Sequence, residues 1–215
     1  MKRFLFLITV LIFQVGSALD AATTEGKNGL LPLGSPMPGF SLTDVVSGQT
    51  VSSEGLPQKK VTMVAFICRS CPYSQHVKKS LAQLGRDYAD KDVAIVTISS
   101  NDSAAYSDDS PESLREMAQE RGFNFPLLFD ESQKTAQSFT AIATPDIFVF
   151  DSNRKLVYRG QFDDTRPHSG GEATGRDVRE AIDALLSGKP VSTHQKSAIG
   201  CSIKWKPGNT PAYAR

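Results

Sequence analysis

Two cysteines separated by two residues are the strongest chemical feature of the sequence. Cys68 and Cys71 lie in "VAFICRSCPYSQHV", where an apolar run ends at the first cysteine and Pro72 follows the second. Such a pair can be a redox-active dithiol, half of a metal site, or a small structural disulfide. The residues on either side favour one of these uses.

The flanking residues predict that the pair lies where a strand turns into a helix. Residues 59–67, "KKVTMVAFI", form an apolar run bounded by charge, which is typical of a buried central strand. Pro72 fits the first helical position, where its missing N–H costs nothing, so Cys71 is expected at the helix cap. Unpaired N–H groups and the helix dipole favour a thiolate there. Arg69 is expected to stabilise this thiolate further.

A metal site is the weaker interpretation of the pair. Zinc usually takes four ligands, whereas the sequence has no second cysteine pair and its histidines, His76, His168 and His194, are scattered. His76 lies about 140° around the helix from Cys71 and is expected to face solvent. A copper site of two thiolates and a distant histidine remains an alternative. We expect no metal and no cofactor.

The first 18 residues are typical of a secretory signal peptide. Lys2 and Arg3 precede an apolar run that ends at Val15, and small residues follow up to Ala18. The run is shorter than the roughly 20 residues that cross a bilayer, so cleavage is favoured over a membrane anchor. We therefore expect an exported protein, periplasmic or secreted, in a compartment where thiols can pair.

The remaining chain predicts one α/β domain. Residues 19–32 read as a flexible lead-in, residues 33–188 as the domain, and residues 189–215 as a C-terminal tail. Apolar periodicity and turn residues predict an N-terminal β-hairpin, then alternating strands and helices, then a second hairpin and a last helix. This order indicates a thioredoxin fold, with a mixed central sheet flanked by helices. The expected elements are a hairpin at 35–52, strands at 59–67, 93–100 and 125–129, helices after Cys71 and at 110–122, 130–139 and 176–188, and a hairpin at 145–162.

Several segments resemble one family. "GSPMPGFSLTD", the cysteine pair after "VAFI", "ATPDIFVF" and "KLVYRGQFDD" are similar to the redoxin branch of the thioredoxin superfamily, the alkyl hydroperoxide reductase and thiol-specific antioxidant proteins related to peroxiredoxins. The resemblance covers about residues 33–213. It implies that Pro145 is a cis-proline facing the cysteines, and that Thr144 and Pro145 line a substrate groove. It also implies that the tail packs on the domain.

The order of action within the pair follows from spacing. In thioredoxin the first cysteine of the pair is the nucleophile, but it comes five residues after a strand phenylalanine, and five residues after Phe66 is Cys71. Peroxiredoxins carry a Thr three residues before the peroxide-reducing cysteine, and Cys68 occupies that place. Losing this Thr weakens a peroxidase interpretation. Spacing and helix physics both predict Cys71 as the nucleophile.

The predicted function is that of an enzyme, an exported thiol–disulfide oxidoreductase in which Cys71 attacks and Cys68 resolves. A thiol peroxidase with antioxidant function is the first alternative, and a copper-binding protein or metallochaperone without turnover is the second. Cys201, in the tail, can resolve a disulfide, pair with another chain, or remain inert.

Expected substrates are thiols and disulfides of proteins or small molecules, with peroxides as a further class. A reductant or oxidant protein is the expected partner that returns the cysteine pair to its starting redox state. The near balance of 24 Lys plus Arg against 23 Asp plus Glu argues against nucleic acid. It also argues against a membrane surface after signal cleavage.

Overall fold

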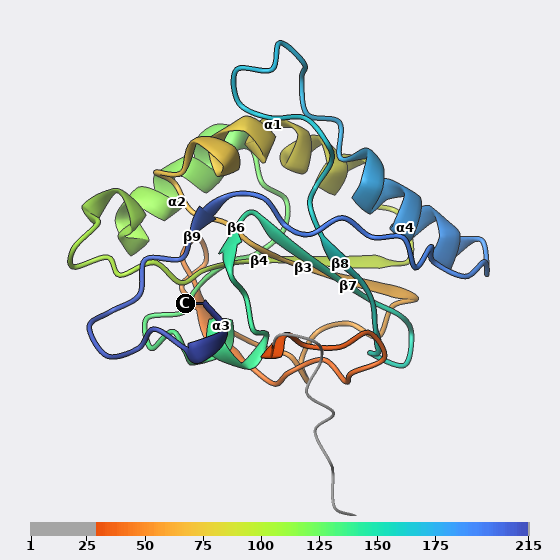
Figure 1. Cartoon of the computed structure of the whole chain (residues 1–215), viewed down its shortest axis with the longest axis horizontal. Helices are drawn as coiled ribbons and strands as arrows, with labels where there is room; N and C mark the ends of the chain where they lie inside the picture. Colours follow the sequence, from red (N-terminus) through yellow and green to blue (C-terminus); the bar gives the residue numbers. More distant parts are fainter. Residues whose placement is uncertain (1–28, 215) are drawn as a thin grey trace, which may run out of the picture.

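A computed structural model describes residues 29–214 of the chain, so the signal peptide expected at 1–18 and most of the lead-in lie outside the described residues. Its centre is a seven-stranded mixed sheet with the order β2-β1-β5-β4-β3-β7-β8 (Figure 1). The strands are β1 (Ser41–Asp44), β2 (Thr50–Ser52), β3 (Val61–Phe66), β4 (Val93–Ser99), β5 (Leu127–Phe129), β7 (Asp146–Phe150) and β8 (Leu156–Gly160).

Strand β3 lies between β4 and β7 near the middle of this sheet. It pairs with β4 in parallel and with β7 antiparallel, and all six of its side chains are buried. A strand covered on both faces must be apolar throughout, which explains the uninterrupted run in the sequence. The cysteine pair therefore begins two residues beyond the end of a central, fully packed strand.

Three helices cover one face of the sheet, and a shorter one lies on the other (Figure 1). Helices α1 (Pro72–Asp87), α2 (Pro111–Arg121) and α4 (Arg176–Leu186) bury their apolar sides in one cluster with β3 and β7. Helix α3 (Lys134–Ser138) belongs to the second cluster, together with Phe139 and residues of the N-terminal segment and the tail. The predicted mixed sheet with flanking helices is confirmed, but three of the helices share one face.

The aromatic core of the second cluster is built around Phe139, directly after α3. Its ring centroid lies 5.4 Å from those of Phe66 and Phe148 and 6.1 Å from that of Phe150, in edge-to-face arrangements. Phe66 and Phe148 lie on the neighbouring strands β3 and β7. This packing fixes the segment that leads from α3 to the strands beside the cysteines.

The N-terminal hairpin continues the main sheet. Strand β1 pairs antiparallel with β2 on one side and with β5 on the other. Asp44 is buried at this junction and accepts hydrogen bonds from the N–H groups of Leu127, Val46 and Ser47. One buried carboxylate thus joins the hairpin turn to β5.

The C-terminal tail returns across the sheet to the region of the cysteines. Strand β9 (Cys201–Ser202) pairs antiparallel with β6 (Ala143–Thr144), and the two lie side by side in Figure 1. Short 3-10 turns occupy Ser107–Asp109 before α2 and Ala212–Ala214 near the end. The tail therefore brings the third cysteine beside the residue that precedes Pro145.

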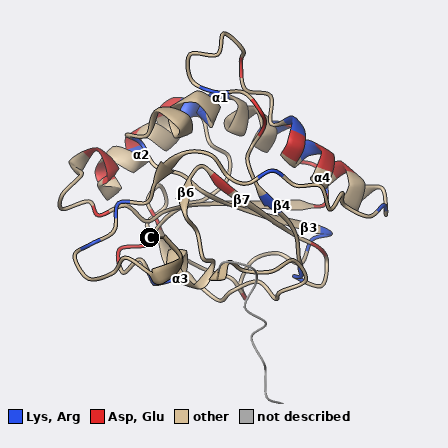
Figure 2. Cartoon of the chain, in the orientation of Figure 1, with Lys and Arg blue, Asp and Glu red and all other residues tan. Residues whose placement is uncertain are grey.

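Charges of both signs are mixed along α2 and α4, in agreement with the sequence (Figure 2). Between residues 29 and 214, no helix has the length and apolarity needed to cross a bilayer.

Helix α1 continues through Gly85, although glycine is unfavourable inside a helix. A Cβ at this position would lie 2.5 Å from a ring carbon of Phe125, and the side-chain amide of Asn124 donates to the Gly85 carbonyl at 3.1 Å. Glycine is required here because the chain after α2 packs directly against the helix backbone.

Gly85→Ala is expected to destabilise the protein by up to about 2 kcal/mol. Helix propensity favours alanine by about 1 kcal/mol, but the added methyl group must displace Phe125, and overpacking costs typically about 1–3 kcal/mol. Urea unfolding measures the difference. Lys79→Ala, on the exposed side of the same helix, is the control and should change stability by less than about 0.5 kcal/mol. A Gly85→Ala protein more stable than the natural chain would contradict this account.

Candidate active site

Cys71 is the N-cap residue of α1. Its backbone is extended, its carbonyl accepts the N–H of Gln75 at 2.9 Å, and Pro72 follows at the first helical position. The N–H of Ser74, in the first turn, donates to the Cys71 sulfur. The side chain is 4% exposed. A sulfur in this position accepts hydrogen bonds from the N–H groups of the helix terminus. Little water reaches the sulfur to compete for these hydrogen bonds.

Cys68 lies deeper in the protein, at the end of the segment that leaves β3. It is 1% exposed, and its N–H donates to the hydroxyl of Ser74 at 3.3 Å. Its sulfur lies 3.1 Å from the hydroxyl of Thr144 and within hydrogen-bonding reach of the Cys71 sulfur. All three cysteines of the chain are free thiols in this structure.

Thr144 contacts both sulfurs of the pair. Its hydroxyl lies 3.1 Å from the Cys68 sulfur, and its carbonyl oxygen lies 3.2 Å from the Cys71 sulfur, which donates to it only in the protonated form. The peptide bond from Thr144 to Pro145 is cis, and both residues are buried. The segment before β7 therefore lies directly against the cysteine pair.

Cys201 is the third sulfur at this site. It lies opposite Thr144 in the pairing of β9 with β6. Hydrogen bonding by its thiol and its backbone N–H is among the causes that lower the pKa of Cys71. Cys201 is half-buried, so it lies between Cys71 and solvent-accessible surface. Sequence reasoning left its position open because nothing local connects residue 201 to residue 71.

The three thiols differ strongly in acidity. The hydrogen bond from the Cys68 thiol is the largest cause that lowers the pKa of Cys71, to about 4, and the donors of Cys201 and Ser74 add to it against the opposing effect of burial. The same hydrogen bond, together with burial, raises the pKa of Cys68. Burial and the contact with Cys71 raise the pKa of Cys201 to about 11. Cys71 is therefore the thiolate of the cluster.

Arg69 does not point at the pair. Its guanidinium donates to the carbonyl of Ser113 at 2.6 Å and forms an ion pair of 3.0 Å with Glu116, both on α2. The main causes of the low Cys71 pKa do not include this side chain. The expected thiolate-stabilising role is corrected, because the long side chain finds its partners on α2.

Asp109 organises the loop between the two cysteines. This fully buried carboxylate accepts the N–H groups of Arg69 and Ser70, at 2.5 and 3.4 Å, and the hydroxyl of Ser70 at 2.9 Å. The side-chain amide of Asn101 also donates to it at 2.8 Å. Sequence reasoning missed this residue because Asp109 lies 40 positions from the loop and resembles an ordinary acid before a helix.

Lys78 is a second residue that the sequence did not single out. It is 3% exposed, and its ammonium group donates to the carbonyl of Arg69 at 2.9 Å. Burial lowers its pKa to about 8, while the charges of Cys68 and Asp109 act in the opposite direction. A buried cation thus holds the cysteine loop from the helix side.

Arg159 and Arg176 form ion pairs with acidic residues. Arg159 donates to the hydroxyl and carbonyl of Thr140 and forms an ion pair with buried Asp146, and it lies over the ring of Phe148. Arg176 forms ion pairs with Asp164, in the loop before α4, and with Asp177, in the first turn of that helix. The contacts found for these two side chains do not include Cys71.

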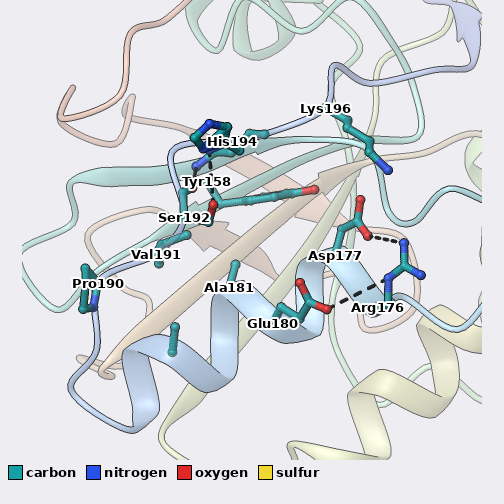
Figure 3. Close-up of a pocket in the computed structure, with 12 residues that line it drawn as sticks. Tyr158, Arg176, Asp177, Glu180, Ala181, Pro190, Val191, Ser192, His194 and Lys196 are labelled. Atoms are coloured by element: carbon teal, nitrogen blue, oxygen red, sulfur yellow. Dashed lines mark hydrogen bonds and ion pairs between the residues drawn. The ribbon is translucent and has the colours of Figure 1, made fainter.

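The histidines lie at separate places. The ring of His76 lies 2.8 Å from the hydroxyl of Thr165, so it is half-buried against the loop before α4, contrary to the expected solvent-facing position. His194 lines a pocket between the tail and α4 (Figure 3). No group of three or more His, Cys, Asp or Glu side chains within residues 29–214 is placed to hold a metal ion.

Comparisons with known proteins agree with this architecture. The model of the AhpC/TSA family matches residues 33–159. No protein of curated function matches the chain. An uncharacterised conserved protein from Geobacillus kaustophilus is 47% identical, with a TM-score of 0.80, and the match covers 82% of this chain and 94% of that one.

Two further solved structures extend the comparison. A hypothetical protein from Sinorhizobium meliloti is 40% identical, with a TM-score of 0.80 and coverage of 82% of this chain and 96% of that one. The thioredoxin domain of a thiol-disulfide oxidoreductase from Bacteroides vulgatus is 18% identical, with a TM-score of 0.54 and coverage of 69% and 96%. The last likeness confirms the thioredoxin fold.

The acidity of Cys71 predicts an unusual pH profile of alkylation. Only the thiolate reacts, so a pKa lowered to about 4 keeps Cys71 reactive at neutral pH, and its rate should fall only as the pH drops through about 4. Site-resolved mass spectrometry of the reduced protein with iodoacetamide measures this. Cys68→Ala should raise the midpoint more than Cys68→Ser, which keeps a hydroxyl donor, and Arg69→Ala should leave it unchanged. A midpoint near the ordinary thiol value of about 8.5 would disprove the thiolate assignment.

Asp109→Ala is expected to cost about 2–4 kcal/mol of unfolding free energy. The substitution leaves buried donors of the cysteine loop without an acceptor, and each such group costs about 1–3 kcal/mol, with less than full additivity. Denaturant unfolding of the reduced protein provides the test. Asp108→Ala, at the exposed neighbouring acid, is the matched control. Equal stability of the two variants would show that Asp109 does not hold the loop.

Proposed function

Because this chain belongs to the AhpC/TSA family, we propose that it is a thiol–disulfide oxidoreductase whose attacking sulfur is Cys71. Membership of the family indicates oxidoreductase activity in general. The observation that carries the specific proposal is the Cys71 sulfur at the N-terminus of α1, held as a thiolate within hydrogen-bonding reach of Cys68. A stabilised thiolate beside a second thiol is the arrangement that disulfide exchange requires.

In the first step, the Cys71 thiolate attacks one sulfur of a substrate disulfide. A new bond forms between Cys71 and that sulfur, the substrate S–S bond breaks, and the other substrate sulfur leaves as a thiolate. The buried strand β3 and the helix α1 hold Cys71 in place, so little conformational freedom is lost on attack.

In the second step, Cys68 resolves the mixed disulfide. Its thiolate attacks the Cys71 sulfur, the bond to the substrate breaks, and the substrate leaves reduced while the pair becomes a disulfide. The hydrogen bond to Cys71 and the Cys71 charge both raise the pKa of Cys68. Both causes disappear once Cys71 is covalently bound. The first step therefore makes Cys68 easier to ionise for the second, and the charge of nearby Lys78 favours the same change.

The acidity of Cys71 also bears on the direction of electron flow. A low thiol pKa stabilises the reduced form of a dithiol pair, which makes its disulfide a stronger oxidant. Run in reverse, the two steps oxidise a substrate dithiol and reduce the pair. We therefore propose that the reduction potential of this pair lies toward the oxidising end of the range found for dithiol–disulfide pairs in proteins.

The substrate side of the site is formed by the segment before β7. Thr144 and Pro145 lie against the sulfurs, and Pro145 shares a narrow depression with Tyr73 and Ile199. Disulfides and thiols of proteins or small molecules are the substrate class that this chemistry serves. The N-terminal sequence supports action after export, where such disulfides persist.

The proposal is tested with Cys71→Ser and Cys68→Ser in a Cys201→Ser background, so that only the pair reacts. Cys71→Ser should lose exchange with 5,5′-dithiobis(2-nitrobenzoate) at neutral pH, because the remaining thiol, Cys68, is only 1% exposed and the reagent has little access to it. Cys68→Ser should keep the first step and accumulate a mixed disulfide on Cys71. Mass spectrometry identifies the modified sulfur.

The opposite pattern, with activity lost in Cys68→Ser and kept in Cys71→Ser, would overturn the assignment. The same reduced Cys201→Ser protein, treated with hydrogen peroxide, tests the peroxidase alternative. Thiol loss faster with peroxide than with the aryl disulfide would favour that alternative over disulfide exchange.

A further inference from the structure

We infer that Cys201 is a third redox cysteine, which the tail strand β9 holds beside Cys71 so that it resolves mixed disulfides formed on Cys71. This inference rests on the proposed role of Cys71 as the attacking sulfur. It assigns to the tail a part in the exchange itself, because a Cys71–Cys201 disulfide competes with the Cys68–Cys71 disulfide and with the disulfide to an external substrate.

The pairing of β9 with β6 sets the approach of Cys201. Cys201 lies opposite Thr144, whose carbonyl oxygen lies 3.2 Å from the Cys71 sulfur, and hydrogen bonding by the thiol and N–H of Cys201 is among the causes that lower the pKa of Cys71. At Gly200, a Cβ would lie 2.6 Å from the Thr144 carbonyl carbon and 3.1 Å from the nitrogen of Pro145. Only glycine at that position lets the tail come this close to the segment beside the pair.

Hydrogen bonds anchor the tail on both sides of Cys201. Before it, the carbonyl of Lys196 accepts the N–H of Gln161 at 3.1 Å. After it, the N–H of Lys204 donates to the side chain of Asn101 at 2.9 Å, and the side-chain amide of Gln133 donates to the Lys204 carbonyl at 2.9 Å. Because both flanks are fixed, Cys201 is held near Cys71 at a high effective concentration.

Asn101 connects the two halves of the site. Its amide nitrogen donates to Asp109, which holds the loop between Cys68 and Cys71, and its oxygen accepts from Lys204 of the tail. The same side chain thus ties the cysteine loop and the cysteine-bearing tail to one point.

Strand β9 also fills the backbone edge of β6 beside Cys71. An extended polypeptide that paired with this edge, in the manner of an added strand, would have to displace β9. The tail therefore competes with extended protein substrates for the edge of β6. Cys201 lies where the reacting cysteine of such a substrate would lie.

The exchange is balanced without an outside oxidant. Starting from a mixed disulfide on Cys71, Cys201 loses its proton to solvent and its thiolate attacks the Cys71 sulfur. The Cys71–Cys201 bond forms, the bond from Cys71 to the substrate breaks, and the substrate leaves as a thiolate. Cys201 is half-buried whereas Cys68 is 1% exposed. An external reductant can therefore attack the Cys71–Cys201 disulfide at Cys201 more easily than it can attack the Cys68–Cys71 disulfide at Cys68.

The experiment uses the full mature chain as Cys68→Ser and as Cys68→Ser/Cys201→Ser, each reduced and then treated with oxidised glutathione. In the double variant, glutathione should remain on Cys71. In the single variant, Cys201 should displace it and leave a Cys71–Cys201 disulfide, with an adduct lifetime at least about tenfold shorter, since a tethered thiol acts at about millimolar effective concentration or more. Peptide mapping identifies the bonds.

A lasting glutathione adduct on Cys71 with the same lifetime in both variants would overturn the inference alone. An unmodified Cys71 in both variants would overturn the proposed nucleophile, and this inference with it. The two failures are therefore distinguishable from the same pair of samples.

Two further variants separate proximity from the mere presence of a thiol. Thr193→Cys in the double variant returns one thiol to the exposed part of the tail, next to the His194 pocket, and should not shorten the lifetime of the adduct. Gly200→Ala in the Cys68→Ser chain keeps Cys71 and Cys201 but pushes the tail away from Thr144. This variant should lengthen the lifetime of the glutathione adduct. Thermal unfolding of each variant confirms that it is folded.

Either of two results with these variants would contradict the role of β9. One is rapid resolution of the glutathione adduct by the thiol that Thr193→Cys introduces. The other is resolution in Cys68→Ser/Gly200→Ala at the same rate as in Cys68→Ser.

Discussion

The site depends on one constraint, which is that a negative charge on Cys71 must be stabilised in a position that is almost closed to water. A buried thiolate is costly unless hydrogen-bond donors surround it. Here the donors come from three parts of the chain, namely the first turn of α1, the thiol of Cys68 and the strand β9 with Cys201. The acidity of Cys71 is therefore a property of the assembled domain.

The rest of the architecture holds these donors in place. The central strand β3 ends just before Cys68, and the packed helix α1 begins just after Cys71. Asp109 and Lys78 fix the loop between the cysteines from two sides. The aromatic cluster around Phe139 supports the segment that leads to β6, and thereby the carbonyl that faces Cys71. Buried polar groups at the site are thus part of a connected network, in which the loss of one member weakens its neighbours.

Arg69 illustrates how a local argument from the sequence can fail. A cation between two cysteines suggests stabilisation of a thiolate, but an arginine side chain is long enough to choose among distant partners. In the folded chain, Glu116 and the Ser113 carbonyl on α2 are better placed than the sulfur. Asp109 illustrates the opposite failure, in which a residue that matters to the site is missed. No local pattern marks an acid whose partner lies 40 residues away.

The sequence by itself determined the elements and their order, because apolar periodicity, caps and turns act within a few residues. The strand before Cys68, the helix after Pro72 and the α/β layout could all be predicted in this way, and the fold class is confirmed. The tertiary structure alone decided that three helices share one face, that α1 runs through Gly85, and that the tail brings Cys201 to Cys71. These features depend on contacts between residues far apart in the chain, and no local pattern encodes which distant groups will meet.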